Sequence, residues 1–286
     1  MDIPFAVAFN TFGALVGAGT VLGMLLVLWC TYYNKLEQDV TLDMVMYSIP
    51  GGFFFAHVLN DLFYVPGKIW KDPMSIFRVW EGLSSYGGMI GGLAIAFLVL
   101  KLRKARILPY SDVLIFGFIF GFMLGRLGCT IAFDHPGYAT SFFMAMKDPQ
   151  GVLRHNLGLY EFIAFIGIFL TMLFVNRKSV PEGTITGLFF VIYAPLRFSL
   201  DFLRLPPSTK GIGKMGDIRY FGLTPGQYFS IVGLFLGLVV LRYAFLHNKP
   251  AGRMLPSQDK GLHNLPKESQ DSQQDATPQL EQESTS

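Results

Sequence analysis

Apolar runs long enough to cross a lipid bilayer recur along most of this chain. A membrane-spanning helix needs about 20 mostly apolar residues. Such runs lie at roughly 5–31, 43–64, 86–101, 110–133, 158–176, 183–204 and 225–246. Only 15% of the residues are charged, against about 25% in a soluble domain. The sequence therefore predicts an all-α membrane protein with about seven spanning helices. Because the third run is short, six spans is the alternative.

Basic residues in the connecting segments predict the orientation of the chain. Basic residues follow every second apolar run: Lys35 follows the first, and the cluster from Lys101 to Arg106 follows the third. The pair Arg177-Lys178 follows the fifth run, and Arg242 and Lys249 follow the seventh. Positively charged loops favour the cytoplasmic side. We therefore expect the N-terminus outside and the C-terminus in the cytoplasm.

The segments outside the runs are of two kinds. The predicted outer loops at 65–85, 134–157 and 205–224 contain aromatic residues suited to the membrane interface. We expect them to be partly embedded above a basic cavity, and simple interfacial anchoring is the alternative. From about Pro250 the composition turns polar and cannot support a packed core. Residues 1–249 are thus the predicted transmembrane domain, and 250–286 a disordered cytoplasmic tail.

Composition also limits the ligands that we expect. The net charge of +3 comes from short basic clusters between apolar runs, which indicates membrane topology and no binding of nucleic acid. Cys30 and Cys129 stand in no metal-ligand spacing, and no histidine forms an HExxH motif. We therefore expect no metal and no cofactor.

The fourth run carries the strongest single candidate, Arg126. Gly117, Gly121 and Gly125 lie on one helical face before it, where small residues allow another helix to approach closely. A guanidinium inside an apolar run marks a functional site unless it snorkels to the interface. Asp134, about two turns later, is placed to pair with Arg126 or to accept a proton. Cys129 lies between them, but a thiol in apolar surroundings is usually inert.

A second charged group lies in the sixth run. Tyr193, Arg197, Asp201 and Arg204 recur at intervals of four, four and three residues, which places them on one face of a helix. Two arginines against one aspartate leave one positive charge, although a self-neutralising ion-pair ladder is the alternative. Together with Arg126, these residues predict a basic cavity suited to a phospholipid head group. His57, near the outer end of the second run, is a further candidate.

Paired glycines open the third run. Gly87 and Gly88 follow Tyr86, and a glycine-rich helix start exposes backbone N–H groups that favour an anion. Close packing against another helix is the alternative for both glycines. Tyr86 is a proton donor or acceptor only if these glycines line a site.

In combination these motifs resemble those of the prolipoprotein diacylglyceryl transferases of bacterial inner membranes. The resemblance covers most of residues 5–246. It is carried by Arg78-Val-Trp-Glu-Gly82 before Tyr86-Gly-Gly-Met-Ile-Gly91, by Gly125-Arg126-Leu-Gly128, by Leu159-Tyr160-Glu161, and by Arg197, Phe202-Leu-Arg204 and Gly226-Gln227. It implies seven spans, an N-terminus outside and membrane lipids as surroundings. It also implies transfer of a diacylglyceryl group from phosphatidylglycerol to the lipobox cysteine thiol of a preprolipoprotein, with release of glycerol phosphate.

The resemblance assigns roles to particular positions. It makes Arg126 the head-group arginine, Arg197 and Arg204 further basic residues, and Tyr193 a hydroxyl of the cavity. The expected catalytic residues are then Tyr86, Arg126, Asp134 and Arg197, and the expected phosphatidylglycerol-binding residues are Arg126, Gly87, Gly88, Tyr193, Arg197, Asp201, Arg204 and His57.

Several positions depart from the family pattern. Tyr86 stands where the family usually has histidine, Cys129 where it has asparagine, and His57 where arginine is common. Asp134 and Asp201 both replace glutamate. The departures keep open the alternative of a divergent member that binds anionic phospholipid or transfers another lipid group. A small-molecule transporter is a third alternative, although the sequence has no internal repeat typical of transporters.

Overall fold

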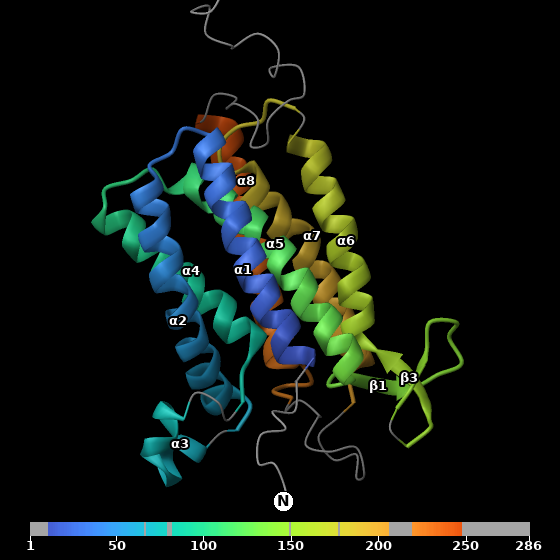
Figure 1. Cartoon of the computed structure of the whole chain (residues 1–286). Helices are drawn as coiled ribbons and strands as arrows, with labels where there is room; N and C mark the ends of the chain where they lie inside the picture. The colour runs from blue at the N-terminus through green and yellow to red at the C-terminus, as the bar shows by residue number, and fades with distance from the viewer. Residues whose placement is uncertain are drawn as a thin grey trace, which may run out of the picture. The chain divides into compact units, whose positions relative to one another are not determined.

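A computed structural model of the chain describes residues 11–65, 67–78, 82–148, 150–176, 178–205 and 219–247. The predicted tail at 250–286 lies outside the described residues, as does most of the loop at 205–224. The long helices are α1 (Thr11–Tyr33), α2 (Gln38–Phe63), α4 (Ser85–Leu102), α5 (Ile107–Ala132), α6 (Leu157–Asn176), α7 (Thr184–Leu200) and α8 (Pro225–His247). Figure 1 shows them running side by side as a bundle. The protein is therefore a predominantly helical, multi-pass membrane protein.

The number of spanning helices agrees with the lower of the two sequence estimates. Within the described residues, six helices are long and apolar enough to cross a membrane, and α4 is a shorter apolar helix. Its 18 residues give a length of roughly 27 Å, slightly less than a hydrocarbon core of about 30 Å. A seventh span therefore stays a prediction.

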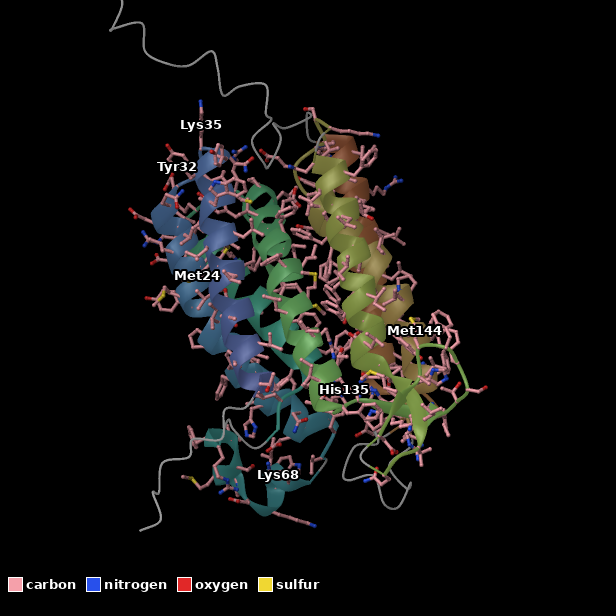
Figure 2. All side chains as sticks on the ribbon, turned by 45° about the vertical axis from the view of Figure 1, so that its right-hand side comes forward. Met24, Tyr32, Lys35, Lys68, His135 and Met144 are labelled. Atoms are coloured by element: carbon pink, nitrogen blue, oxygen red, sulfur yellow. The ribbon has the colours of Figure 1, made fainter. Side chains whose placement is uncertain are left out.

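The connecting segments separate into two groups, as the charge pattern suggests. Lys35 lies at one end of the bundle, and Lys68 and His135 lie at the other (Figure 2). The latter end carries two of the predicted outer loops. One of these contains the short helices α3 (Lys68–Lys71) and η1 (Pro73–Phe77). The grouping fits the predicted orientation, although which end faces outward stays a prediction.

The other of these loops contains a small three-stranded sheet, which the sequence does not predict and which leaves the chain predominantly helical. Strands β1 (Pro136–Ala139), β2 (Met146–Lys147) and β3 (Leu153–Asn156) form an antiparallel sheet in the order β1-β3-β2. It lies beside the lower end of α6 in Figure 1. Strands of two to four residues are too short to give a recognisable alternation in the sequence.

Helix pairs in the bundle meet through glycine. A Cβ atom added to Gly19 of α1 would lie 2.5 Å from the carbonyl oxygen of Gly121, and one added to Gly23 would lie 2.9 Å from that of Gly117. This close approach confirms the predicted packing face of α5. Gly125 differs, because a Cβ there would meet Val16 at an ordinary 3.9 Å. Pairs α2–α4 and α7–α8 pack closely as well.

Candidate active site

Five buried charged side chains form a line of alternating sign through the bundle. Arg126 Nη2 lies 3.0 Å from Glu161 Oε2, and Glu161 Oε1 lies 3.7 Å from Arg197 Nε. Arg197 Nη1 also pairs with Asp201 Oδ1, which lies 3.4 Å from Arg204 Nε. None of the five residues is more than 7% exposed. We call this group the charge ladder.

The charge ladder has one positive charge in excess. Three guanidinium groups face two carboxylates, which leaves a formal charge of +1. Glu161, the partner of both Arg126 and Arg197, is not among the site residues predicted from the sequence. Buried ions are costly unless they are paired. A buried excess of positive charge therefore favours an anionic ligand.

The end of α7 departs from the continuous helix that the sequence suggested. The α-helix stops at Leu200, Asp201 begins the single turn η2 (Asp201–Leu203), and Arg204 is extended. The predicted single helical face is therefore wrong beyond Leu200. The polar groups of Arg197, Asp201 and Arg204 meet nevertheless, because a bridge to Gly137 of β1 holds Arg204 beside the sheet.

The start of α8 holds Asp201 in place. Thr224 Oγ1 donates a hydrogen bond of 2.6 Å to Asp201 Oδ2. A Cβ atom added to Gly226 would lie 2.5 Å from the same oxygen, so only glycine fits at this position. Gln227 Nε2 donates to the carbonyl of Phe198 at 3.2 Å, which fixes α8 against the end of α7. Gly226 and Gln227 thus have a structural reason to be part of the motif.

Tyr86 lies at the charge ladder, but its hydroxyl is already engaged. It lies 2.6 Å from Ser230 Oγ, which itself donates to the carbonyl of Gly226 at 2.8 Å. With the Ser230 proton so used, Tyr86 is the donor of the pair. Its ring faces the guanidinium of Arg197 at 5.6 Å, a distance typical of a cation–π contact.

Tyr193 also joins the ladder, by donating to Glu161 Oε2 at 3.3 Å. Its ring stacks on that of Phe189, with centroids 5.4 Å apart. Between α4, α5 and α7 the described side chains leave a narrow gap without room for a water molecule, lined by Tyr86, Met89, Phe118, Phe122 and Tyr193. The predicted open basic cavity therefore stays a prediction.

The paired glycines are engaged in packing and capping. A Cβ atom added to Gly87 would lie 2.8 Å from the carbonyl oxygen of Phe55, and Gly88 packs against Ala56. The Gly87 amide donates to Ser84 Oγ, and the Gly88 amide donates to the Ser84 carbonyl. The packing alternative thus explains both glycines, and their lipid-binding role stays a prediction.

His57 holds the neighbouring outer loop. Its Nε2 lies 2.7 Å from the carbonyl oxygen of Ser75, and its Nδ1 lies 3.1 Å from that of Gly82. The imidazole thus lies between two carbonyl oxygens of this loop, and Asp61 Oδ2 lies 3.6 Å from its Nε2. The contacts of His57 within the described residues are with this loop and with Asp61, so its head-group role stays a prediction.

Asp134 lies beyond the end of α5, where the backbone reverses at Phe133 (φ 50°, ψ 38°). Its carboxylate, the Cys129 thiol and the His135 imidazole each place one atom within 4.8 Å of the others. Burial raises the pKa of Asp134 above its ordinary value, while the charge of Arg126 opposes the rise. Asp134 is therefore near enough to Arg126 to be affected by its charge. The carboxylate that pairs with the Arg126 guanidinium at 3.0 Å, however, belongs to Glu161.

Glu161 is the functional candidate that sequence reasoning missed. It lies near the start of the apolar run that forms α6 and is fully buried there. A carboxylate at such a position is a functional-site signal by itself, and that signal was available from the sequence. The pairing with Arg126 was not available, because it depends on how α5 and α6 pack.

Comparison with known proteins supports one family for this chain. The model of the family "Prolipoprotein diacylglyceryl transferase" matches residues 1–243. A phosphatidylglycerol–prolipoprotein diacylglyceryl transferase of Polynucleobacter asymbioticus is 33% identical over 73% of this chain and 78% of the relative. The enzyme of that name from Cupriavidus pinatubonensis is 29% identical over 77% of this chain and 79% of the relative. These matches show that the chain belongs to the prolipoprotein diacylglyceryl transferase family.

Proposed function

We propose that this protein transfers a diacylglyceryl group from phosphatidylglycerol to the lipobox cysteine of preprolipoproteins. The observation that carries the proposal is the charge ladder, which concentrates a buried excess positive charge in a member of this family. Phosphatidylglycerol is an anionic lipid, and its phosphate is the group such a site would attract. The reaction belongs to lipoprotein maturation at the bacterial inner membrane.

The arginines bind and activate the donor lipid in this proposal. Arg126 offers a planar set of donors that matches phosphate oxygens. Arg197 and Arg204 add to the positive electrostatic potential at this position. As the bond between the glyceryl carbon and the phosphate oxygen breaks, negative charge grows on the departing glycerol phosphate. Fixed positive groups in a site of low dielectric constant stabilise that charge most when it is fully developed.

The acceptor is the lipobox thiol. Its sulfur attacks the glyceryl carbon that carries the phosphate, so a carbon–sulfur bond forms while the carbon–oxygen bond breaks. The electron pair of the broken bond leaves with glycerol phosphate, and the thiol proton passes to Asp134. A carboxylate is suited to accept this proton. The product is a thioether, and the step uses neither cysteine of the protein.

The remaining candidates position these groups. Tyr86 supports Arg197 through its ring, Tyr193 orients Glu161, and Asp201 holds Arg197 and Arg204 together. We retain Gly87, Gly88 and His57 as candidates for the lipid-facing surface, next to their packing roles. Each of these assignments is tested by substitution in the transfer reaction.

The direct test uses purified protein, phosphatidylglycerol and a lipobox peptide, with mass spectrometry of the peptide. We expect a diacylglyceryl thioether on the peptide cysteine, and no product on a control peptide with serine in its place. Binding of phosphatidylglycerol without any thioether would contradict the proposal. That result would favour the alternative of a divergent protein that binds or transfers another lipid. The departures from the family pattern at Tyr86, Cys129 and Asp134 are the basis of that alternative.

A further inference from the structure

Three side chains with metal-ligating atoms meet where α5 ends. The Cys129 thiol, the Asp134 carboxylate and the His135 imidazole each offer one atom, and these atoms all lie within 4.8 Å of one another. Asp134 Oδ1 and His135 Nδ1 are 3.8 Å apart. Two tetrahedral zinc ligands with bonds of 2.0–2.1 Å are separated by about 3.4 Å. A small inward movement of these side chains would complete a three-ligand set.

The fold brings these residues together at a fixed turn. Phe133 adopts the left-handed conformation (φ 50°, ψ 38°) directly after α5, so Asp134 and His135 turn back toward Cys129. The carbonyl of His135 accepts a hydrogen bond of 3.2 Å from the Leu157 amide at the start of α6. Figure 2 places His135 at this end of the bundle, where the chain enters the small sheet. The three ligands are therefore held by α5, α6 and the sheet together.

One oxygen of the cluster lacks a hydrogen-bond partner. Asp134 Oδ1 is inaccessible to solvent and makes no hydrogen bond within the described residues. The 3.8 Å to His135 Nδ1 is too long for a hydrogen bond. A buried carboxylate oxygen left without a donor is costly, and a cation between Oδ1 and Nδ1 would satisfy both atoms.

The charges around the cluster are compatible with a divalent cation. A thiolate and a carboxylate together offset two positive charges, so the loaded site is neutral. Arg126 Nη1 lies 4.0 Å from Cys129 Sγ, and its positive charge favours the thiolate that a metal requires, whereas burial of Cys129 opposes it. The charge of Arg126 is itself offset by Glu161 at 3.0 Å. Because Glu161 is shared with Arg197 at 3.7 Å, the compensation of a bound cation comes from the thiolate and the carboxylate.

We propose that Cys129, Asp134 and His135 form a binding site for a thiophilic divalent cation of the zinc class. Thiolate, imidazole and carboxylate are the ligands that zinc takes, and three protein ligands leave a fourth position open. This revises the expectation of no metal site. The spacing of one cysteine and an adjacent Asp-His pair matches no metal motif, and only the turn at Phe133 makes the cluster.

The site has a consequence for the proposed transfer. A bound cation occupies the Asp134 carboxylate, which the acceptor thiol needs as its base, and it attracts that thiol to the open fourth position. We therefore expect zinc to inhibit transfer reversibly, with full recovery after chelation. This consequence rests on the proposed function, whereas binding itself does not.

Binding is measured on the full-length protein in detergent, purified without a polyhistidine tag and stripped with a chelator. Titration with Cd²⁺ should give a saturable thiolate-to-metal charge-transfer band at one equivalent, and Zn²⁺ should displace it. We expect Cys129→Ser to abolish the band. Since loss of an outer-shell partner alone weakens metal binding about 10–100-fold, Asp134→Asn and His135→Gln should each weaken it at least tenfold. The matched controls Cys30→Ser and His247→Gln should leave the titration unchanged.

Three results would overturn the proposal. They are the absence of a saturable band, a band that persists in Cys129→Ser, and unchanged affinity in both Asp134→Asn and His135→Gln. Thermal unfolding of each variant without metal identifies any variant that fails to fold. The proposal is then judged on the metal affinity of the variants that do fold. Because no lipid or peptide is present, absence of transfer activity does not affect this test, and a failed titration leaves the proposed transfer intact.

Discussion

The guanidinium of Arg126 and the carboxylate of Glu161 meet 3.0 Å apart across the contact between α5 and α6. Arg126 is 2% exposed and Glu161 is fully buried. The pair is the start of the charge ladder, and it explains how an arginine is retained inside an apolar helix. Because Glu161 also faces Arg197, this one carboxylate sets the relative positions of two of the three arginines.

Removing the charge of Glu161 should therefore be severe. Glu161→Gln keeps the shape of the side chain but leaves two buried arginines without their shared partner. We expect a loss of about 3–5 kcal/mol in the free energy of unfolding, together with loss of transfer. Thermal unfolding in detergent measures the first effect. The control is Glu182→Gln, because Glu182 pairs at 2.9 Å with the exposed Arg106, and such surface pairs contribute about 0–1 kcal/mol.

Thr224 tests the hydrogen bond that holds Asp201 in the charge ladder. Its hydroxyl donates to Asp201 Oδ2 at 2.6 Å, and both residues are fully buried. Thr224→Val removes the donor without changing the shape of the side chain. A hydrogen bond to a charged group contributes about 1.5–3 kcal/mol, so we expect a loss of that size and weaker binding of phosphatidylglycerol. Thr224→Ser should retain both properties, and equal losses in the two variants would contradict the role of the hydroxyl.

Two substitutions of Tyr86 distinguish a role of its hydroxyl in the reaction from a role of its ring in positioning Arg197. Its hydroxyl donates to Ser230, while its ring faces Arg197. We expect Tyr86→Phe to lower the rate of transfer by less than about tenfold, since one neutral hydrogen bond contributes about 1 kcal/mol. Tyr86→Ala should be far more damaging, because it removes the ring as well. Initial rates with saturating peptide measure both. Complete loss in Tyr86→Phe would show that the hydroxyl takes part in proton transfer.

The sequence predicts the helical part of the fold well and the site only in part. Apolar runs and the glycine spacing on α5 depend on local composition, so both could be predicted. The sheet at Pro136–Asn156 has strands too short for a periodic signal. Arg126 could be found because an arginine in an apolar run is conspicuous. Its pairing with Glu161 depends on the contact between two helices, which no local pattern contains.

The glycine contact between α1 and α5 gives a test of the fold. A Cβ atom on Gly121 would lie 2.7 Å from the carbonyl oxygen of Gly19, so Gly121→Ala must push the helices apart. We expect a loss of about 1–3 kcal/mol, as for other overpacked interfaces. Gly17 is the matched control on α1, because a Cβ there meets nothing within 4 Å. Thermal unfolding of Gly121→Ala and Gly17→Ala should therefore differ, and equal stability would contradict the described packing.

The measurement that tests the central claim most directly is the rate of thioether formation with Arg126→Ala. Phosphatidylglycerol and a lipobox peptide are the substrates, and Arg103→Ala is the control, because Arg103 pairs with Asp43 on the exposed surface. We expect the Arg103 variant to match the unsubstituted protein. The Arg126 variant should lose transfer by about a hundredfold to a thousandfold, since one fixed donor at a developing charge contributes about 2.7–4 kcal/mol. Near-normal transfer by a folded Arg126→Ala protein would contradict the claim that the charge ladder is the active site.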